Sequence, residues 1–498
     1  MDIKGKSLSC WMAALVSVGS LVAADGDLRL VQAVKNKDQE AVRSLLKQNV
    51  DVNARLGDGS TALAWAAHWD DLETADLLIR AGADVNGTSD YGVSPLWEAC
   101  NNGSAAMVEK LANIAANTNT VLRGGETALM RCARTGNGDA VKALLARGAD
   151  VNVKDTQRGQ TPLMWALEER HPDVVRVLID READVRARTR GGFTPLMFAA
   201  RQGDMDSARL LLGKGADVNE ASQAGLNALL VAADSGREEF AIFLLQQGAN
   251  PDAADADGLT ALHYSLRKGI SGMRGSQHDP GSYGEVSLSY MFRSNMSALV
   301  RTLLEHGANP NARIVKGGGR HQPARASDRP KLAMAGATPY LLAAATGDTN
   351  LMRALAAKGA DPKLGTNDGV TPLMAAAGVG MAEDRAKEEQ QGALEAVQLL
   401  VELGADVNAV SKDGWRAVHG AAYTGANEII QFLVEKGARL DVRNKYGHTP
   451  LAIADGDPNY LTDAFERRLH PDTAELIRKL GGDPLAGDPS PVAVNSNP

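Results

Sequence analysis

The chain has 498 residues, of which 44% are hydrophobic, 23% are charged and only 4% are aromatic. This composition excludes both a largely disordered chain and a multi-span membrane protein. A formal net charge of −8 argues against binding nucleic acid or an anionic membrane over a broad surface, because such binding requires a basic face.

The first residues have the three-part pattern of an export signal. Lys4 and Lys6 precede an apolar run over 8–22, and small residues follow it up to Ala24. The pattern predicts a signal peptide over 1–24, cleaved after Ala24, and a periplasmic or extracellular protein. The alternative is an uncleaved membrane anchor, but a run of about 15 residues is shorter than the ~20 needed to span a bilayer. No other stretch reaches that length, so we expect no membrane span after cleavage.

A tripeptide of the form Thr/Ser-Pro/Ala-Leu recurs through the rest of the chain. From Thr61 to Thr260 its successive copies are 33 or 34 residues apart, and a glycine lies two residues before every copy. A second motif, Gly-Ala-Asp/Asn-Val/Pro-Asn, follows about twenty-one residues later, as at 148–152. The first residues of the tripeptides, with two variants, are Thr61, Ser94, Thr127, Thr161, Thr194, Asn227, Thr260, Thr338, Thr371, Arg416 and Thr449. We call these eleven the capping residues.

Each part of the period predicts a local structure. The capping residue accepts from free amides at the start of a helix, and a following proline suits the first helical position. A first helix then ends at a glycine such as Gly203, and a second helix over 205–214 is apolar at helical spacing. One such unit cannot bury its own apolar face, so stacked units are required.

This pattern resembles the ankyrin repeat, in which a turn and two antiparallel helices occupy 33 residues. The resemblance covers about 27–483, and segments such as 191–200 are similar to exported bacterial multi-ankyrin-repeat proteins. It implies an all-α ankyrin-repeat solenoid of about twelve repeats with β-turn or hairpin tips, forming an array over 25–483. The family's histidine after Thr-Pro-Leu is present only as His263 and His419, for which we expect a structural hydrogen-bonding role.

Four insertions interrupt the array, and a disordered tail is expected at its end. The insertions are expected as loops near 269–296, 314–335, 378–391 and 455–471, with the tail over 484–498. The second loop is basic because it contains Lys316, Arg320, Arg325, Arg329 and Lys331 but only one acid. It is either a contact for an acidic partner or phosphate group, or a solvated loop without a binding role.

No residue set in the chain is typical of catalysis, so we predict that the protein is not an enzyme. The nine histidines lack metal-binding spacing, and we expect no metal and no cofactor. Cys100 and Cys132 replace small inner residues in adjacent repeats. Such positions should lie about 10 Å apart, beyond the ~7 Å limit on the Cα separation of a disulfide, so we expect buried free thiols.

The resemblance also implies where a partner would bind. Ankyrin proteins usually bind along a concave groove formed by turn tips and first helices, so the contact residues flank each capping residue and line the first helix. Trp, Tyr and Arg are common interface anchors. The residues expected to contact a partner are Trp65, His68, Trp69, Trp165, Phe193, Phe198, Arg201, Tyr264, Trp415 and Tyr423. Alternatively, the aromatic residues pack between repeats; Trp69 and Trp415 are the two most expected to be exposed.

These observations predict an exported, non-catalytic, monomeric scaffold that binds a protein partner and no nucleic acid. Two other functions fit the same sequence: an accessory or inhibitor subunit of an exported enzyme, and a secreted effector that binds host proteins. The identity of the partner does not follow from repeats, because the fold determines a surface rather than a ligand.

Overall fold

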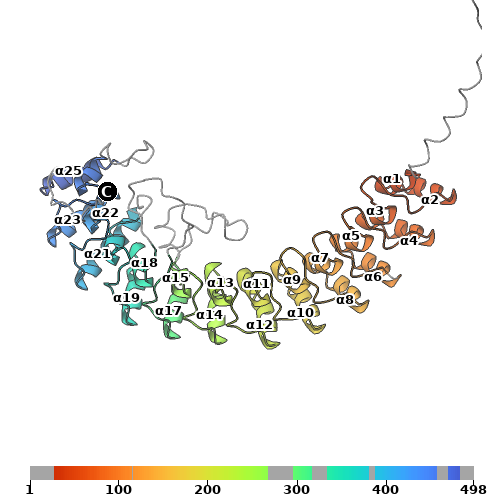
Figure 1. The fold of residues 1–498 in the computed structure, drawn as a ribbon, viewed down its shortest axis with the longest axis horizontal. Helices are drawn as coiled ribbons and strands as arrows, with labels where there is room; N and C mark the ends of the chain where they lie inside the picture. The colour runs from red at the N-terminus through yellow and green to blue at the C-terminus, as the bar shows by residue number, and fades with distance from the viewer. Residues whose placement is uncertain are drawn as a thin grey trace, which may run out of the picture. The chain divides into compact units, whose positions relative to one another are not determined.

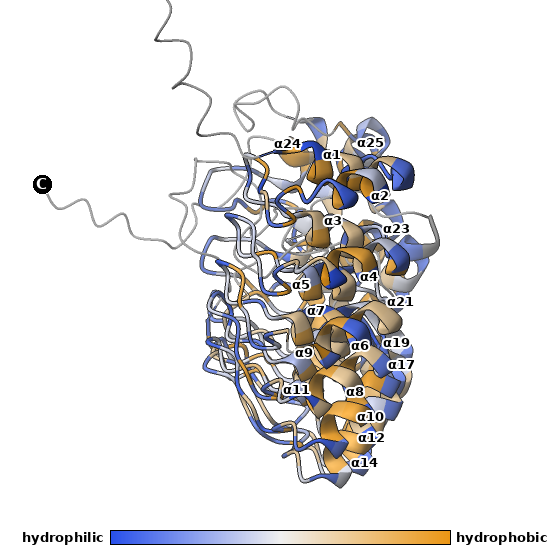
Figure 2. Ribbon diagram, turned by 90° about the vertical axis from the view of Figure 1, so that its right-hand side faces the viewer, coloured by the Kyte–Doolittle hydropathy of each residue, from blue (hydrophilic) through white to orange (hydrophobic). Residues whose placement is uncertain are grey.

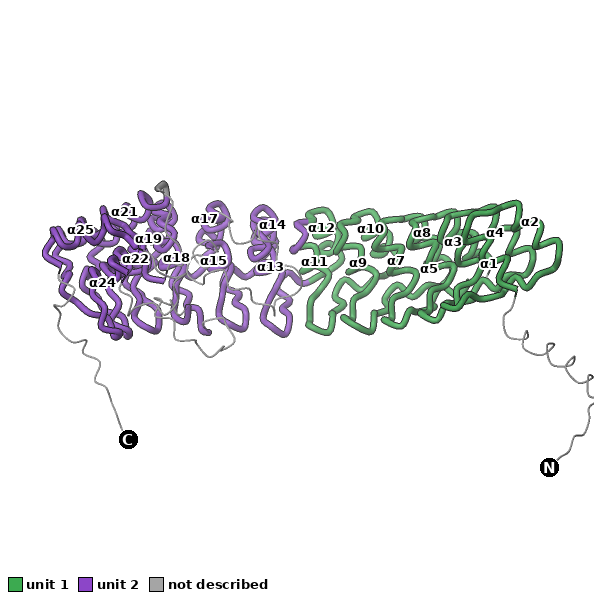
Figure 3. The backbone as a smooth tube through the Cα atoms, turned by 90° about the horizontal axis from the view of Figure 1, so that it is seen from above, with its two compact units in different colours: residues 1–199, 204–216 green, residues 200–203, 217–498 purple. Residues whose placement is uncertain are grey.

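The computed structural model describes residues 27–114, 116–266, 295–316, 334–380, 387–456 and 469–482. The chain divides into two compact units (Figure 3). Unit 1 extends to residue 199 and includes 204–216, and unit 2 contains 200–203 and continues from residue 217. The predicted signal peptide and tail lie outside the described residues.

Helix pairs build unit 1, each with a first helix of seven or eight residues and a second helix of nine (Figure 1). The last residues of α11 fall in unit 2. The helices are α1 (Arg29–Lys35), α2 (Gln39–Lys47), α3 (Ala62–His68), α4 (Leu72–Arg80), α5 (Pro95–Asn101), α6 (Ala105–Asn113), α7 (Ala128–Thr135), α8 (Gly138–Ala146), α9 (Pro162–Glu168), α10 (Pro172–Asp180), α11 (Pro195–Gln202) and α12 (Met205–Gly213).

Unit 2 continues the same helix pairs, with more variable lengths. Its helices are α13 (Ala228–Asp234), α14 (Glu238–Gln246), α15 (Ala261–Ser265), α17 (Ser297–Glu305), α18 (Pro339–Ala345), α19 (Thr349–Ala357), α20 (Pro372–Ala376), α21 (Lys387–Glu402), α22 (Ala417–Tyr423), α23 (Asn427–Glu435), α24 (Pro450–Asp455) and α25 (Pro471–Lys479). The twelve pairs confirm the all-α repeat architecture. In place of hairpin strands, the turn tips in the described residues contain isolated bridges such as Arg55 to Thr61.

The capping residues begin the first helices as the sequence predicts. The Thr61 hydroxyl accepts from the Ala64 amide at 3.2 Å, and equivalent bonds begin α5, α7 and α9. The loop to the second helix needs one residue with positive φ, which is glycine in most repeats, as at Gly103 with φ +68°. Lys37, Asp70 and Arg170 occupy the same loop position with φ between 55° and 61°.

Asparagine side chains join consecutive repeats. The Asn53 side chain donates to the Gly82 carbonyl at 3.3 Å and accepts from the Asp84 amide at 2.7 Å, one repeat further on. Asn119 and Asn152 make the same pair of bonds in unit 1. These bonds explain why asparagine ends the Gly-Ala-Asp-Val-Asn motif, since its amide group both donates and accepts.

Apolar residues of the helices form the core (Figure 2). Leucines two residues after the capping residue, such as Leu63 and Leu129, are fully buried, as are the paired alanines Ala66 and Ala67. Because alanine is small, adjacent first helices approach closely. Within the described chain, no helix is long and apolar enough to cross a membrane.

Cys100 and Cys132 form a disulfide between α5 and α7, so the prediction of free thiols is wrong. Their Cα atoms lie 4.6 Å apart, and both side chains are buried. Cys100 is the sixth residue after Ser94, whereas Cys132 is the fifth after Thr127. The two residues therefore face each other across adjacent helices instead of occupying equivalent positions one repeat apart.

The described residues resume the repeat on both sides of the insertions. In an uninterrupted repeat the Ser104 amide donates to the Ala99 carbonyl, and the Met296 amide donates to the Ser265 carbonyl at 2.9 Å in the same way. The first bond joins residues five apart and the second joins residues 31 apart. Most of the expected loops 269–296, 314–335 and 455–471 lies outside the described residues.

The insertion over 378–391 differs from the loop that the sequence predicts. Residues 387–391 are the first residues of α21, which has 16 residues where most second helices have nine. Lys, Glu and Gln favour helices, so this end of the insertion extends the second helix instead of forming a loop.

Candidate functional site

The first helices of unit 1 pack side by side, so corresponding side chains align on one face. Adjacent pairs are α1 with α3, α3 with α5, α5 with α7, and α7 with α9. We call the aligned residues the first-helix face of unit 1. They are Lys35, Lys37, Trp65, His68, Trp69, Trp97, Glu98, Arg131, Arg134, Trp165 and Glu169.

Two tryptophans and a histidine form one end of this face. The Trp69 ring is 39% exposed, and its indole N–H donates to the Lys35 carbonyl at 3.2 Å. Trp65 is half-buried and donates to the Ser60 hydroxyl at 3.1 Å. His68 lies edge-on to both rings, with centroid distances of 5.3 and 4.6 Å. The structure therefore brings together three of the residues that the sequence predicts.

Ion pairs connect neighbouring repeats along the rest of the face. His68 Nδ1 lies 3.1 Å from a Glu98 carboxylate oxygen, and Arg134 Nε lies 3.0 Å from Glu169. Arg134 also lies over the Trp165 ring, 5.5 Å from its centroid. These mixed aromatic and charged side chains are partly exposed and held in place, which is typical of interface anchors.

Trp97 adds a further aromatic ring to this face. Arg131 lies 4.5 Å from the Trp97 centroid and pairs with Glu126 at 2.7 Å. The indole N–H groups of Trp97 and Trp165 are buried and have no hydrogen-bond partner among the described residues.

Phe193 and Phe198 pack on each other in unit 1, and only one of them is accessible. Their rings are edge-on with centroids 6.3 Å apart. Phe193 is half-buried, but Phe198 is 4% exposed, which favours the alternative in which aromatic residues pack between repeats.

The predicted residues of unit 2 are mostly interior. Trp415 is 3% exposed and Tyr423 is 5% exposed, so the expectation that Trp415 is exposed is wrong, whereas contact of either residue with a partner stays a prediction. Trp415 packs edge-on against His419, with ring centroids 5.8 Å apart. Tyr264 is half-buried and its hydroxyl donates to Asp255 at 2.5 Å, and Arg201 is half-buried.

The predicted basic loop is described only at its first cation. Lys316 is exposed, and its amide donates to the Asp257 carbonyl at 3.1 Å. Arg320, Arg325, Arg329 and Lys331 lie outside the described residues.

His263 and His419 are structural, as the sequence predicts. Nδ1 of each ring accepts from the backbone amide of its capping residue, Thr260 or Arg416, at 3.1 Å. Burial lowers the pKa of His263 to about 4 and that of His419 to about 3, so both rings are neutral at physiological pH. In the parts of the chain that the structure describes, no group of histidines, cysteines and acids could hold a metal ion.

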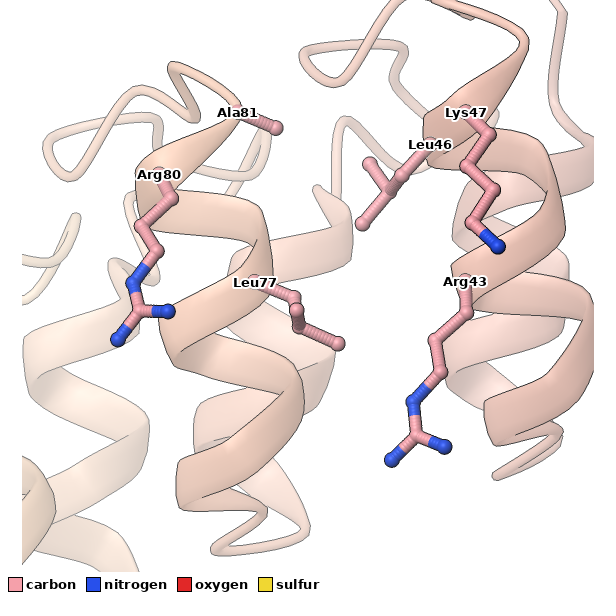
Figure 4. A pocket seen from close by; sticks show the side chains of 6 residues that line it. All are labelled: Arg43, Leu46, Lys47, Leu77, Arg80 and Ala81. Atoms are coloured by element: carbon pink, nitrogen blue, oxygen red, sulfur yellow. The ribbon is translucent and has the colours of Figure 1, made fainter.

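A shallow groove of ≈ 450 Å³ lies between the second helices α2 and α4 (Figure 4). Leu46 and Leu77 point into the space between the helices, and Lys47 and Arg80 lie at its edge. The sequence analysis missed this groove because it considered only first helices. Arg43 in the groove is paired with Glu73, so its charge is already compensated.

The sequence analysis also missed Lys35 and Lys37. Lys35 Nζ lies 4.7 Å from the Trp65 centroid, and Lys37 Nζ lies 3.9 Å from the Trp69 centroid. The signal that could have revealed Lys37 is its place in the loop after the first helix, where most repeats have glycine.

Sequence comparison with known proteins identifies the repeat that forms these helix pairs. A family model for ankyrin repeats (three copies) matches residues 30–121, 71–155, 129–222, 196–314 and 386–461. The chain is 33% identical over 92 residues to ankyrin repeat and SAM domain-containing protein 6 of Rattus norvegicus. It is 51% identical over 55 residues to regulatory protein NPR5 of Arabidopsis thaliana.

These short matches cover 18% and 11% of this chain, and they span only 10% and 11% of the relatives. The stacked helix pairs define an α-helical repeat protein in which side chains of successive first helices form one continuous surface. Because the family model covers more than half of the residues, the chain belongs to the ankyrin-repeat family. Ankyrin repeats are protein–protein interaction modules and are generally non-catalytic.

Proposed function

We propose that this protein is a non-catalytic scaffold that binds a protein partner through the first-helix face of unit 1. The difference between the two units carries the proposal. In unit 1 the face presents partly exposed tryptophans and charged pairs, whereas corresponding positions of unit 2 such as Leu342, Ala345 and Tyr423 are buried. A partner that needs aromatic and charged anchors therefore finds them in unit 1.

We further propose that the protein is exported. The three-part pattern over 1–24 supports export, and so does the disulfide between Cys100 and Cys132, because disulfides persist mainly in oxidising compartments. Mass spectrometry of protein purified from its native source tests both points. We expect a mature N-terminus at Asp25 and no free thiol at Cys100 or Cys132 before reduction. An intact Met1 together with two free thiols would contradict export.

Removal of one ion pair tests the binding face. Arg134→Ala combined with Glu169→Ala deletes an exposed pair of unit 1 without changing the net charge. Exposed pairs contribute little to stability, so the fold should be unaffected. Affinity capture from native extract should yield less partner with this variant than with the unchanged chain, as quantified by mass spectrometry.

A matched pair in unit 2 provides the control. Lys445 lies 2.6 Å from Asp413 at a turn tip, and Lys445→Ala combined with Asp413→Ala makes the same chemical change. We expect this control variant to capture the partner as well as the unchanged chain does. Equal capture by the control and by the unit 1 variant would mean that the partner binds elsewhere.

A further inference from the structure

Lys35 and Lys37 present two ammonium groups at the end of the first-helix face. Each ammonium group lies over an indole ring, at 4.7 Å from Trp65 and 3.9 Å from Trp69. The lysine side chains are exposed, and Trp69 is partly exposed beside them. Cation–π contact holds each charge in place on one side and leaves its other N–H groups directed to solvent.

The rings that support these charges are themselves fixed. Trp65 and Trp69 each donate an indole hydrogen bond, to the Ser60 hydroxyl and to the Lys35 carbonyl. His68 lies edge-on to both rings, and the Asn102 side chain donates to the His68 carbonyl at 2.5 Å. The cluster therefore keeps its shape without a ligand, which lowers the entropic cost of binding one.

Acidic groups near the cluster do not pair with its two lysines, and Glu98 pairs with His68 instead. Among the described residues, no carboxylate lies within ion-pair distance of Lys35 or Lys37. Asp58 is close enough for Lys35 to lower its pKa, but hydrogen bonds from Ser60 are the main cause of that shift. Asp38 and Asp71 accept from the first amides of α2 and α4. Neither lysine therefore has an ion-paired carboxylate in the part of the chain that the structure describes.

The backbone at Lys37 is a second, independent observation. Its φ of 59° lies in the left-handed region, at a loop position where Gly103, Gly136 and Gly203 occur in other repeats of the chain. A side chain in this region is less favourable than glycine. The conformation alone does not indicate a function, because Asp70 and Arg170 share it at the same loop position, but at Lys37 the side chain places its charge over Trp69.

We propose that the cluster of Lys35, Lys37, Trp65, His68 and Trp69 anchors an acidic segment of a protein partner. A carboxylate of the partner pairs with the two ammonium groups, and an adjacent apolar side chain packs on the exposed face of Trp69. The inference rests on the proposed function and adds the chemical class of the segment that is recognised. Charge complementarity selects the acidic segment, since a basic one would be repelled.

A pair of synthetic peptides tests the proposal on the full chain. One is the capped hexapeptide Glu-Asp-Phe-Glu-Leu-Asp, and the other has Gln and Asn in place of every acid. Fluorescence anisotropy should give an affinity at least about tenfold higher for the acidic peptide, and this preference should fall as NaCl increases. Equal affinity for the two peptides, or no binding of the acidic one, would overturn the proposal.

Lys37→Gly separates binding from folding. Glycine suits a φ of 59°, so the melting temperature should stay the same or rise while the acidic peptide binds about tenfold more weakly. Arg170→Gly makes the same change at the equivalent loop position of another repeat, with φ 61°, and should leave peptide affinity unchanged. Lys47→Gln removes a cation from α2 of the same repeat and should also have no effect.

The variants distinguish this inference from the proposed function. If Lys37→Gly binds the acidic peptide as tightly as the unchanged chain, the anchoring site is wrong. Binding of the native partner through the rest of the first-helix face would still be measured by the Arg134 and Glu169 variant. A different outcome is that the variant with both Arg134 and Glu169 replaced captures the partner normally while Lys37→Gly loses the peptide. In that case the acidic-segment site is supported, and the proposed role of the Arg134–Glu169 pair in partner binding is wrong.

Discussion

Tyr340 is a polar residue at a core position where most repeats have leucine. It is the second residue after Thr338, equivalent to Leu63 and Leu373. Its side chain is fully buried, and its hydroxyl has no hydrogen-bond partner in the described part of the chain. Burial raises the pKa of Tyr340 to about 12. The position therefore combines good ring packing with an unfavourable buried hydroxyl.

Tyr340→Phe should increase stability. The change keeps the ring and removes the unpaired hydroxyl, so we expect the free energy of unfolding to rise by about 1 kcal/mol. Urea unfolding followed by circular dichroism measures this difference. Tyr340→Leu is the control for ring packing and should be less stable than the phenylalanine variant. A loss of about 1 kcal/mol or more in Tyr340→Phe would show that the hydroxyl has a partner.

The buried histidines make stability depend on pH. His263 has a folded-state pKa of about 4, below its ordinary value of 6.5. Between these values the unfolded chain binds a proton that the folded chain does not. The stabilisation is therefore complete above pH 6.5 and is lost as the pH falls toward 4. His419 acts in the same direction, with a pKa of about 3.

His263→Met should reduce this acid sensitivity. Methionine occupies the same position in other repeats, as Met130 and Met374 show. From pH 7 to pH 5 the unchanged chain should lose about 2 kcal/mol more stability than the variant. The reason is that the variant has no buried histidine that binds a proton only in the unfolded chain. Urea unfolding at the two pH values measures the difference. His306→Met changes an exposed histidine of the same unit and should leave the acid sensitivity unchanged.

Among the elements, α5 and α7 are the pair joined covalently. In a repeat array each helix pair contacts only its neighbours, so a bond between adjacent repeats strengthens one interface directly. The disulfide closes a loop between residues 32 apart in the sequence. Loops of this kind stabilise a fold chiefly by restricting the unfolded chain.

Reduction of the disulfide should therefore destabilise unit 1. We expect a loss of about 2–4 kcal/mol on adding a reductant, measured as a lower melting temperature of the full chain. Cys100→Ala combined with Cys132→Ala should melt at the same lower temperature and should not respond to reductant. Alanine is the residue that most repeats have at these positions, so packing is little disturbed. Unchanged melting of the reduced wild-type chain would contradict the prediction.

The helix pairs could be predicted from the sequence because their motifs repeat. Features that occur in a single repeat, such as the disulfide and the burial of Trp415, could not be predicted. Capping residues and loop glycines recur at fixed spacing, so the helix starts and the structural role of His263 could be predicted. The disulfide was missed because Cys100 and Cys132 differ by one position within their repeats, and this difference decides whether two side chains face each other. Trp415 is buried against His419, and the repeat pattern does not show which aromatic rings pack inward in this way.

At the scale of the whole molecule, one repeat pattern carries two kinds of first-helix surface. The positions that are partly exposed in unit 1, such as Trp65 and Arg134, are Leu342 and Ala345 in unit 2, and both of these are buried. The periodic sequence predicts the same groove in every repeat. The side chains at the variable positions determine where that groove can bind, so the candidate surface could be predicted only in part.

The segment inserted between α15 and α17 leaves the repeat around it unchanged. The Met296 amide and Ser265 carbonyl make the hydrogen bond that closes an uninterrupted repeat, and α15 packs on α17 as other first and second helices do. The repeat therefore has its normal hydrogen bond and packing at both ends of the inserted segment, and loop length itself changes stability only slowly.

Replacing residues 266–295 with the four residues 200–203, which are the end of α11 and Gly203, should consequently leave the fold of unit 2 intact. The bond from the Met296 amide would then join residues at the spacing of an uninterrupted repeat. We expect the same helical circular dichroism and a melting temperature within a few degrees of the full chain. The matched control replaces Met296 with Pro in the full chain, which removes the amide donor and should lower the melting temperature. A large loss of helix in the shortened chain would show that the inserted segment is required by the repeats around it.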